Sequence, residues 1–116
     1  MEETFGRRSM YIIYKKDQPK VEVFEGVTRH TLACGKDVLM ARFDYKEGAT
    51  VPPHKHSYEQ VTTILDGEQK IIIEGDEGPE EFIVKTGDTY IVPASFSHEQ
   101  VILRDSVTID AWSLAP

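Results

Sequence analysis

Hydrophobic residues along this chain fall into short runs separated by turn-forming residues. The runs span three to six residues and are rich in Ile, Val, Tyr and Phe, the side chains that fit a pleated surface. Turn signals recur about every 8–12 residues, which is typical of a β-sandwich or barrel, and no long segment has a helical period. The pattern predicts an all-β fold, closed into a barrel or folded into two sheets so that few strand edges stay exposed. The runs are Met10–Tyr14, Val38–Phe43, Val61–Leu65, Ile71–Ile73, Phe82–Val84, Tyr90–Val92, Val101–Leu103 and Val107–Ile109.

Two segments carry more specific expectations. Asp66-Gly67 is a favourable dipeptide for a tight hairpin turn, so a hairpin is expected there. Met10–Tyr14 would be an aggregation-prone edge strand if it stayed exposed, so it is expected either to pair with a second subunit or to close the domain's own sheet. Residues 1–9 are polar and are expected to form an extension that is flexible or engaged elsewhere. Residues 10–116 are then expected to form one β-barrel domain.

Composition and charge narrow the classes of partner. The chain has 116 residues, 40% of them hydrophobic and 28% charged, a balance that excludes bulk disorder. Its net charge of −7 argues against nucleic acid or an anionic membrane as the main partner, because both favour basic patches. We see no signal peptide and no apolar run near the roughly 20 residues of a membrane helix. A single cysteine, Cys34, fits a reducing compartment, so a cytoplasmic protein is expected.

Three of the four histidines are spaced like ligands of a metal ion. His54 and His56 are two residues apart, so both imidazoles lie on the same face of a strand. Gln60 follows at an even step, and His98 comes from a distant strand. Divalent metals such as Ni, Zn, Mn, Fe and Co suit imidazole nitrogens completed by an oxygen ligand. The spacing therefore indicates a divalent metal site, without indicating which ion it holds.

The residues around these histidines resemble the two motifs of the cupin superfamily. Residues 48–67 read as a glycine, five residues, His-x-His, three residues, Gln60, six residues and a glycine. Residues 87–102 read as a glycine, five residues, proline, and then His98 five positions later. The resemblance implies a cupin jelly-roll barrel whose metal ligands are His54, His56, Gln60 and His98.

Three positions depart from the usual motifs. Gln60 replaces a glutamate ligand, Ser95 replaces a glycine and Ile102 replaces an asparagine. Three neutral imidazoles and a neutral amide leave the charge of the metal uncompensated, which favours Lewis-acid chemistry over oxygen activation.

The chain looks most like the small single-domain cupins of the KdgF type, which take part in pectin and alginate breakdown. That resemblance implies ring opening of 4,5-unsaturated uronates to linear keto forms, with Asp110 and Trp112 facing the substrate. The residues agree, because Asp110 lies in an apolar strand where a carboxylate is costly unless it is paired or catalytic. Asp110 and Trp112 also share a strand face, so the carboxylate could move a proton while the indole packs on the sugar.

KdgF-type proteins usually carry a basic residue past the last strand, and residues 114–116 read Leu-Ala-Pro at that place, so a substrate carboxylate is expected to need another cation. Arg42 and Arg104 are the candidate cations for a substrate carboxylate, and Tyr58 is a candidate hydrogen-bond donor. The expected partners are a small-molecule substrate and a second copy of the chain, since cupins of this kind are commonly dimers. Three other interpretations stay open: a small-molecule dioxygenase, a non-catalytic ligand-binding or sensor cupin, and a metal-free structural relative.

Overall fold

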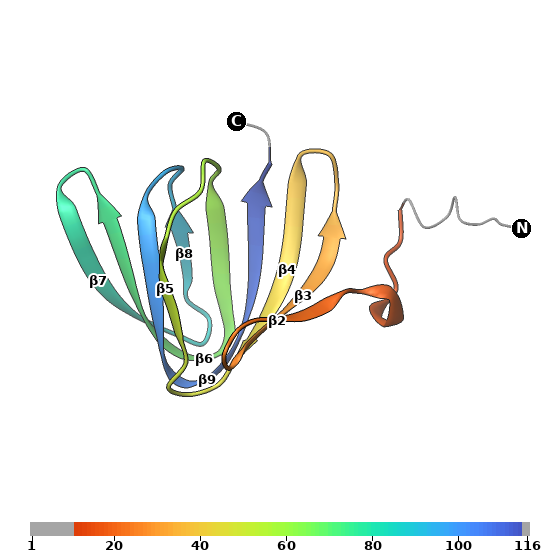
Figure 1. The fold of residues 1–116 in the computed structure, drawn as a ribbon, viewed down its shortest axis with the longest axis horizontal. Coiled ribbons are helices and arrows are strands. Elements are labelled where there is room, and N and C mark those ends of the chain that lie inside the picture. The colour runs from red at the N-terminus through yellow and green to blue at the C-terminus, as the bar shows by residue number, and fades with distance from the viewer. Residues whose placement is uncertain (1–10, 115–116) are drawn as a thin grey trace, which may run out of the picture.

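The computed structural model describes residues 11–114, which form a strongly bent antiparallel sheet with no α-helix in that range (Figure 1). The all-β prediction is confirmed. The elements are η2 (Lys15–Asp17), β2 (Lys20–Phe24), β3 (Val27–Cys34), β4 (Val38–Tyr45), β5 (Thr50–His54), β6 (Gln60–Gly75), β7 (Gly78–Lys85), β8 (Thr89–Val92) and β9 (Ser97–Ser113). No helix in the described part of the chain is long and apolar enough to span a membrane.

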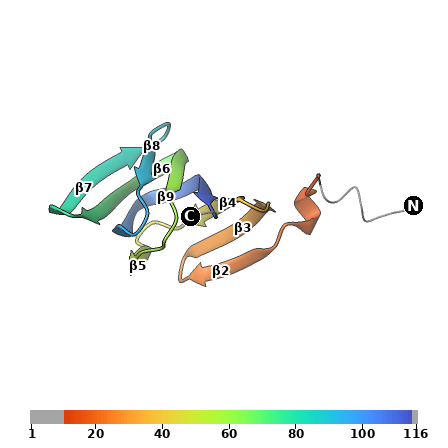
Figure 2. The same cartoon turned by 90° about the horizontal axis from the view of Figure 1, so that it is seen from above.

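Two long strands, β6 and β9, hold the barrel together. They pair with each other along most of their length, from Gln60 opposite Trp112 to Glu74 opposite Ser97. The second half of β9 also pairs with β4, which leads to β3 and β2, while the first half of β6 pairs with β8. At their other ends, β9 pairs with β5 and β6 pairs with β7. Each long strand therefore contributes to two walls, which Figure 2 shows from above.

The predicted hairpin at Asp66-Gly67 is wrong, because β6 runs through this dipeptide and bends there. The register of β6 against β9 shifts repeatedly between Ile64 and Gln69. Gly67 has φ +125°, and a Cβ at this position would overlap the side chain of Ser106 on β9. Positive φ and close approach both select glycine. The same dipeptide thus suits a bulged bend and a tight hairpin. Here it forms a bend, because β6 stays paired with β9 on both sides of it.

The predicted strand over Met10–Tyr14 is also wrong for the part that is described. Met10 lies outside the described residues, and residues 11–14 are not in a strand. Tyr11 is 84% exposed, and the next three side chains are exposed as well. Consecutive apolar residues lack the alternation that buries one strand face, and this segment leads away from the sheets before β2 begins (Figures 1 and 2).

Inward positions alternate along the strands and change from apolar to polar along the barrel. One apolar cluster gathers around Val27, Tyr45, Val51 and Ile102, and a second around Ile64, Ile71 and Val84. Further inward positions hold polar side chains with little or no exposure. They are Gln60, Thr62, Gln69, His98, Gln100, Thr108 and Asp110. Such a concentration of buried polar groups is costly unless they are hydrogen-bonded, so it indicates a site.

Candidate metal centre and cavity

Three histidines converge at one end of the barrel. His54 ends β5 and lies opposite His98 near the start of β9, while His56 follows two residues later. The ring centroid of His98 lies 4.1 Å from that of His54 and 5.1 Å from that of His56. One nitrogen from each ring lies within 4.8 Å of the others. Sequence spacing predicted this convergence.

Hydrogen bonds to backbone carbonyls orient each of the three rings. The Nδ1 atoms of His54, His56 and His98 lie 3.1 Å, 2.8 Å and 3.2 Å from the carbonyl oxygens of Pro52, Tyr58 and Phe96. A proton on each Nδ1 satisfies these contacts and leaves Nε2 as a lone pair, the arrangement that metal-binding histidines use.

His98 has the features expected of a metal ligand. Its Nε2 is buried and has no hydrogen-bond partner among the described residues. Burial, together with the neighbouring His54 and His56, lowers the pKa of His98 to about 4, although the hydrogen bond to the Phe96 carbonyl acts in the opposite direction. The imidazole is therefore neutral near pH 7. A buried lone pair without a partner fits a divalent cation well.

The side-chain amide of Gln60 completes the donor set. Gln60 is buried at the start of β6, and its Nε2 donates to Thr62 Oγ1 at 2.9 Å and to Asp110 Oδ2 at 3.0 Å. This leaves Oε1 facing the site, 3.0 Å from His56 Nε2, where it also accepts a hydrogen bond from Trp112 Nε1. With His56 protonated on Nδ1, two acceptors face each other. Such a pair is satisfied by a shared cation, so the four side chains fit a metal ion.

Asp110 is buried, 3% exposed, in the second half of β9. Its carboxylate accepts hydrogen bonds from Thr108 at 2.7 Å, Thr62 at 2.9 Å and Gln60 at 3.0 Å. Burial raises the pKa of Asp110 to about 6, although these three hydrogen bonds act in the opposite direction. A carboxyl group with this pKa can both accept and donate a proton near neutral pH.

The polar network continues beyond Asp110 along the inside of the barrel. The Tyr45 hydroxyl lies 3.4 Å from Thr108 Oγ1 and accepts a hydrogen bond from Gln100 Nε2, which also donates to Gln69. Burial and the nearby carboxylate raise the pKa of Tyr45, so this phenol stays protonated. Sequence reasoning missed Tyr45 and Gln100. The even spacing of Gln100 from His98 was the available signal.

Part of this polar network lines one cavity of about 290 Å³, namely Tyr45, His54, Gln60, His98, Gln100, Asp110 and Trp112. That volume is near the lower limit of small-molecule sites, about 300 Å³, and suits a ligand the size of one sugar unit. Five of the predicted site residues lie on its wall: His54, Gln60, His98, Asp110 and Trp112. The Trp112 ring also packs edge-on against Phe43, with centroids 6.1 Å apart.

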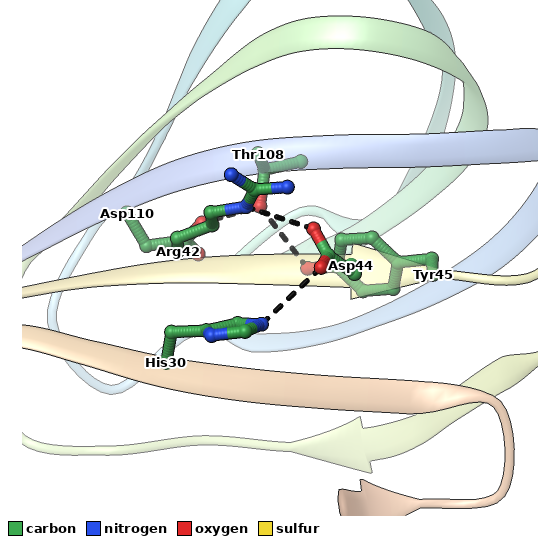
Figure 3. A network of polar contacts seen from close by, with 6 residues as sticks. All are labelled: His30, Arg42, Asp44, Tyr45, Thr108 and Asp110. Atoms are coloured by element: carbon green, nitrogen blue, oxygen red, sulfur yellow. Dashed lines mark hydrogen bonds and ion pairs between the residues drawn. The ribbon is translucent and has the colours of Figure 1, made fainter. Parts of the chain in front are cut away.

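The two predicted arginines lie elsewhere. Arg42 is exposed on the outer face of β4, where its Nε donates to Asp44 at 2.9 Å, and His30 contacts the same carboxylate at 3.2 Å (Figure 3). Arg104 lies at the bend of β9, exposed, 3.7 Å from Asp66. The bend interrupts the alternation, so its even step from His98 does not place it inside.

Tyr58 lies beside the candidate metal centre and is not among the residues that line the cavity. Its ring stacks on His56, with centroids 4.8 Å apart and the ring planes 13° from parallel. Its carbonyl oxygen is the acceptor that orients the same imidazole. The structure thus places Tyr58 where it holds His56 in position.

Comparison with known proteins agrees with this architecture. Residues 41–109 match the cupin domain family. The chain is 32% identical over 99 residues to the pectin degradation protein KdgF of Dickeya dadantii (strain 3937), covering 84% of this chain and 86% of the relative.

Solved structures show the same fold at lower sequence identity. An RmlC-like cupin from Shewanella frigidimarina matches with a TM-score of 0.80 and 21% identity, covering 90% of this chain and 91% of that one. KdgF from Halomonas sp. matches with a TM-score of 0.78 and 24% identity, covering 90% and 94%. The jelly-roll barrel and the family prediction are both confirmed, and the chain belongs to the cupin family, with KdgF among its relatives.

Proposed function

We propose that this protein is a metal-dependent enzyme that opens the ring of 4,5-unsaturated uronates and yields their linear keto forms. The observation that carries the proposal is Asp110, a buried carboxyl with a pKa of about 6 on the cavity wall that also holds His54 and His98. The similarity to KdgF supports the substrate class. The cavity volume supports a monosaccharide rather than a longer oligomer.

His54, His56, His98 and Gln60 would hold the divalent metal, which would supply Lewis-acid polarisation of substrate oxygens. Because all four ligands are neutral, the site would favour anionic oxygen ligands. Which divalent ion is bound is decided by supply as much as by these ligands. Metal analysis of the purified protein answers that question directly.

In the proposed mechanism Asp110 carries the proton. Its carboxylate accepts the proton of the anomeric hydroxyl while the bond between the anomeric carbon and the ring oxygen breaks. The electrons of that bond pass to the ring oxygen, which forms an enolate with the 4,5 double bond. Protonated Asp110 then donates the proton to carbon 4, and the product is the linear keto aldehyde. No atom is gained or lost, and a pKa near 6 suits both transfers.

Trp112 would orient both the substrate and the metal-binding side chain of Gln60. Its indole presents a flat apolar surface at the cavity, on which a sugar ring can pack. Its Nε1 donates to Gln60 Oε1 at 3.0 Å and so holds the amide oxygen toward the metal centre.

The test is the loss of ultraviolet absorbance of the ring double bond, using metal-loaded protein and unsaturated galacturonate or mannuronate freshly made by a lyase. Asp110→Asn should slow the reaction about 10²- to 10⁴-fold, the usual contribution of a general acid–base group. Asp44→Asn is the matched control, because Asp44 is a carboxylate of neighbouring β4 on the outer face. Absence of acceleration by the wild type, or equal rates for both variants, would contradict the proposal. Oxygen uptake by the iron-loaded protein would favour a dioxygenase instead.

We further propose that the protein is a cytoplasmic homodimer whose cupin domain spans residues 10–116. Four consecutive exposed apolar side chains, Tyr11 to Tyr14, support the dimer, because a second copy would remove them from water. Light scattering should give twice the chain mass, and Ile12→Asp with Ile13→Asp should halve it. The free thiol of Cys34 fits a reducing compartment, which cell fractionation can test.

A further inference from the structure

Arg29 lies on the inner face of the barrel, in the wall of the cavity. It is two residues after the buried Val27 on β3, so both side chains are on the same face of the strand. Its neighbours across the sheet are Val21 on β2 and Phe43 on β4. Arg29 lines the same cavity as Asp110 and Trp112.

The guanidinium of Arg29 has no partner within the described part of the chain. The other two arginines in that part, Arg42 and Arg104, pair with carboxylates on the outer surface. Arg29 makes no hydrogen bond or ion pair with any residue between 11 and 114, and both cross-strand neighbours are apolar. Arg29 is a partly buried residue whose guanidinium has no acceptor in that part of the chain, so its donors are free to bind an anion from solution.

The chemistry of the cavity selects the kind of anion. Arg29 is its one permanently charged cation among the described residues, in a chain of net charge −7. A guanidinium presents parallel N–H donors that match the two oxygens of a carboxylate. Arg29 and Asp110 line the same space but do not pair with each other, so a ligand can lie between the cation and the proton-transfer group.

We propose that Arg29 binds the carboxylate of a sugar acid and is the residue that makes the cavity selective for uronates over neutral sugars. This inference rests on the proposed function for the identity of the substrate. The metal centre would then polarise the hydroxyl and ring oxygens of the sugar, on which negative charge develops during ring opening. The binding of the substrate carboxylate, which was expected of Arg42 or Arg104, is thus assigned to Arg29 on β3.

The experiment measures steady-state kinetics of the Zn²⁺-loaded protein with unsaturated galacturonate and with its methyl ester. Arg29→Met should raise KM roughly 10- to 100-fold with little change in kcat, the expected loss of one charge-assisted pair. The variant should also lose the preference for the acid over the ester, while Arg29→Lys keeps part of it. Arg42→Met removes an outer arginine and should behave as the wild type. An unchanged KM and acid preference in Arg29→Met would overturn the assignment.

Binding of stable ligands separates this inference from the proposed reaction. Calorimetry with galacturonate and galactose requires no turnover. If the wild type binds galacturonate more tightly than galactose and Arg29→Met does not, Arg29 is the anion site even if no ring opening is detected. If the wild type does not discriminate between the two sugars, or the variant discriminates equally well, the anion site is refuted. Circular dichroism of Arg29→Met and Arg29→Lys confirms that the variants are folded.

Discussion

Replacing Asp110 with asparagine should change how the stability of the metal-free protein depends on pH. The carboxyl has a pKa of about 6 in the folded protein and 3.8 as its ordinary value. Between these two values the folded state keeps a proton that the unfolded state has released. Stability is therefore highest below pH 3.8 with respect to this group, and it falls as pH rises through 6.

The size of the effect follows from the difference between the two pKa values. A difference of about 2 units corresponds to about 3 kcal/mol, because each unit is worth 1.36 kcal/mol. An asparagine side chain cannot titrate in this range, so the variant should gain about 3 kcal/mol relative to wild type between pH 3.5 and 7. Lost or rearranged hydrogen bonds to Thr62 and Thr108 add an offset to the difference that does not depend on pH.

His98 titrates in the same interval with the opposite sign. Its folded pKa of about 4 lies below the ordinary 6.5, so its contribution to stability is present above pH 6.5 and is lost as pH falls through 4. Both proteins contain His98, and its contribution cancels in the difference between them. In the wild type the two contributions oppose each other, so its free energy of unfolding should depend less on pH than either group alone predicts.

Urea unfolding in the presence of EDTA, followed by far-ultraviolet circular dichroism, gives the free energies from pH 3.5 to 7.5. Asp44→Asn serves as the control, because Asp44 is a partly exposed carboxylate on the outer face. A difference between Asp110→Asn and wild type that stays constant within about 0.5 kcal/mol over this range would refute the reasoning, since the predicted change is about six times larger.

The other predictions concern the ligands and the bend. His56→Ala should reduce bound metal, measured per chain after dialysis, from about one equivalent to below 0.1, whereas His30→Ala on the outer face should retain it. Gly67→Ala should destabilise the fold by about 3 kcal/mol in urea, through positive φ and steric overlap. Gly78→Ala shares only the positive φ and should cost about 1 kcal/mol, so equal losses would contradict the overlap. Gln60→Glu would place a second carboxyl beside the buried one, so the pH profile of the ring-opening rate should move upward by roughly one unit; an unchanged profile would argue against direct coupling.

The side-chain alternation of strands explains why part of the site was predictable. Asp110 and Trp112 are two residues apart within β9, so their shared direction could be read from the spacing. For His54 and His56 the spacing also predicted the convergence, although β5 ends at His54 and His56 lies just beyond it. The same rule failed for Arg104, because the strand bends between Ile102 and Ser106. Bends depend on the partner strand and leave little signal in the sequence itself.

Other parts of the structure had weaker signals. β2 alternates charged and apolar residues, β3 has a polar centre, and β5 contains Pro52 and Pro53, so none of the three resembled a run of apolar residues. Arg29 lies on one of these strands, and its position in the cavity depends on pairing with β4. Pairing between strands is a long-range property that the spacing along one strand does not encode, so Arg29 was absent from the predicted site residues.

The double membership of β9 has a consequence for how cupins of this shape can adapt to new ligands. His98 near its start and Asp110 near its end belong to one continuous strand, so the angle of the bend between them contributes to the separation of the three histidines from the carboxyl. Substitutions in the lining can alter what the site recognises. Changes near Gly67 and Ser106, which do not line the cavity, would instead alter the span of the site. Adaptation to a larger ligand would therefore appear as substitutions at Gly67 and Ser106, where the two long strands pack closely at the bend. Such substitutions could change the size of the site while the residues that carry the chemistry stay the same.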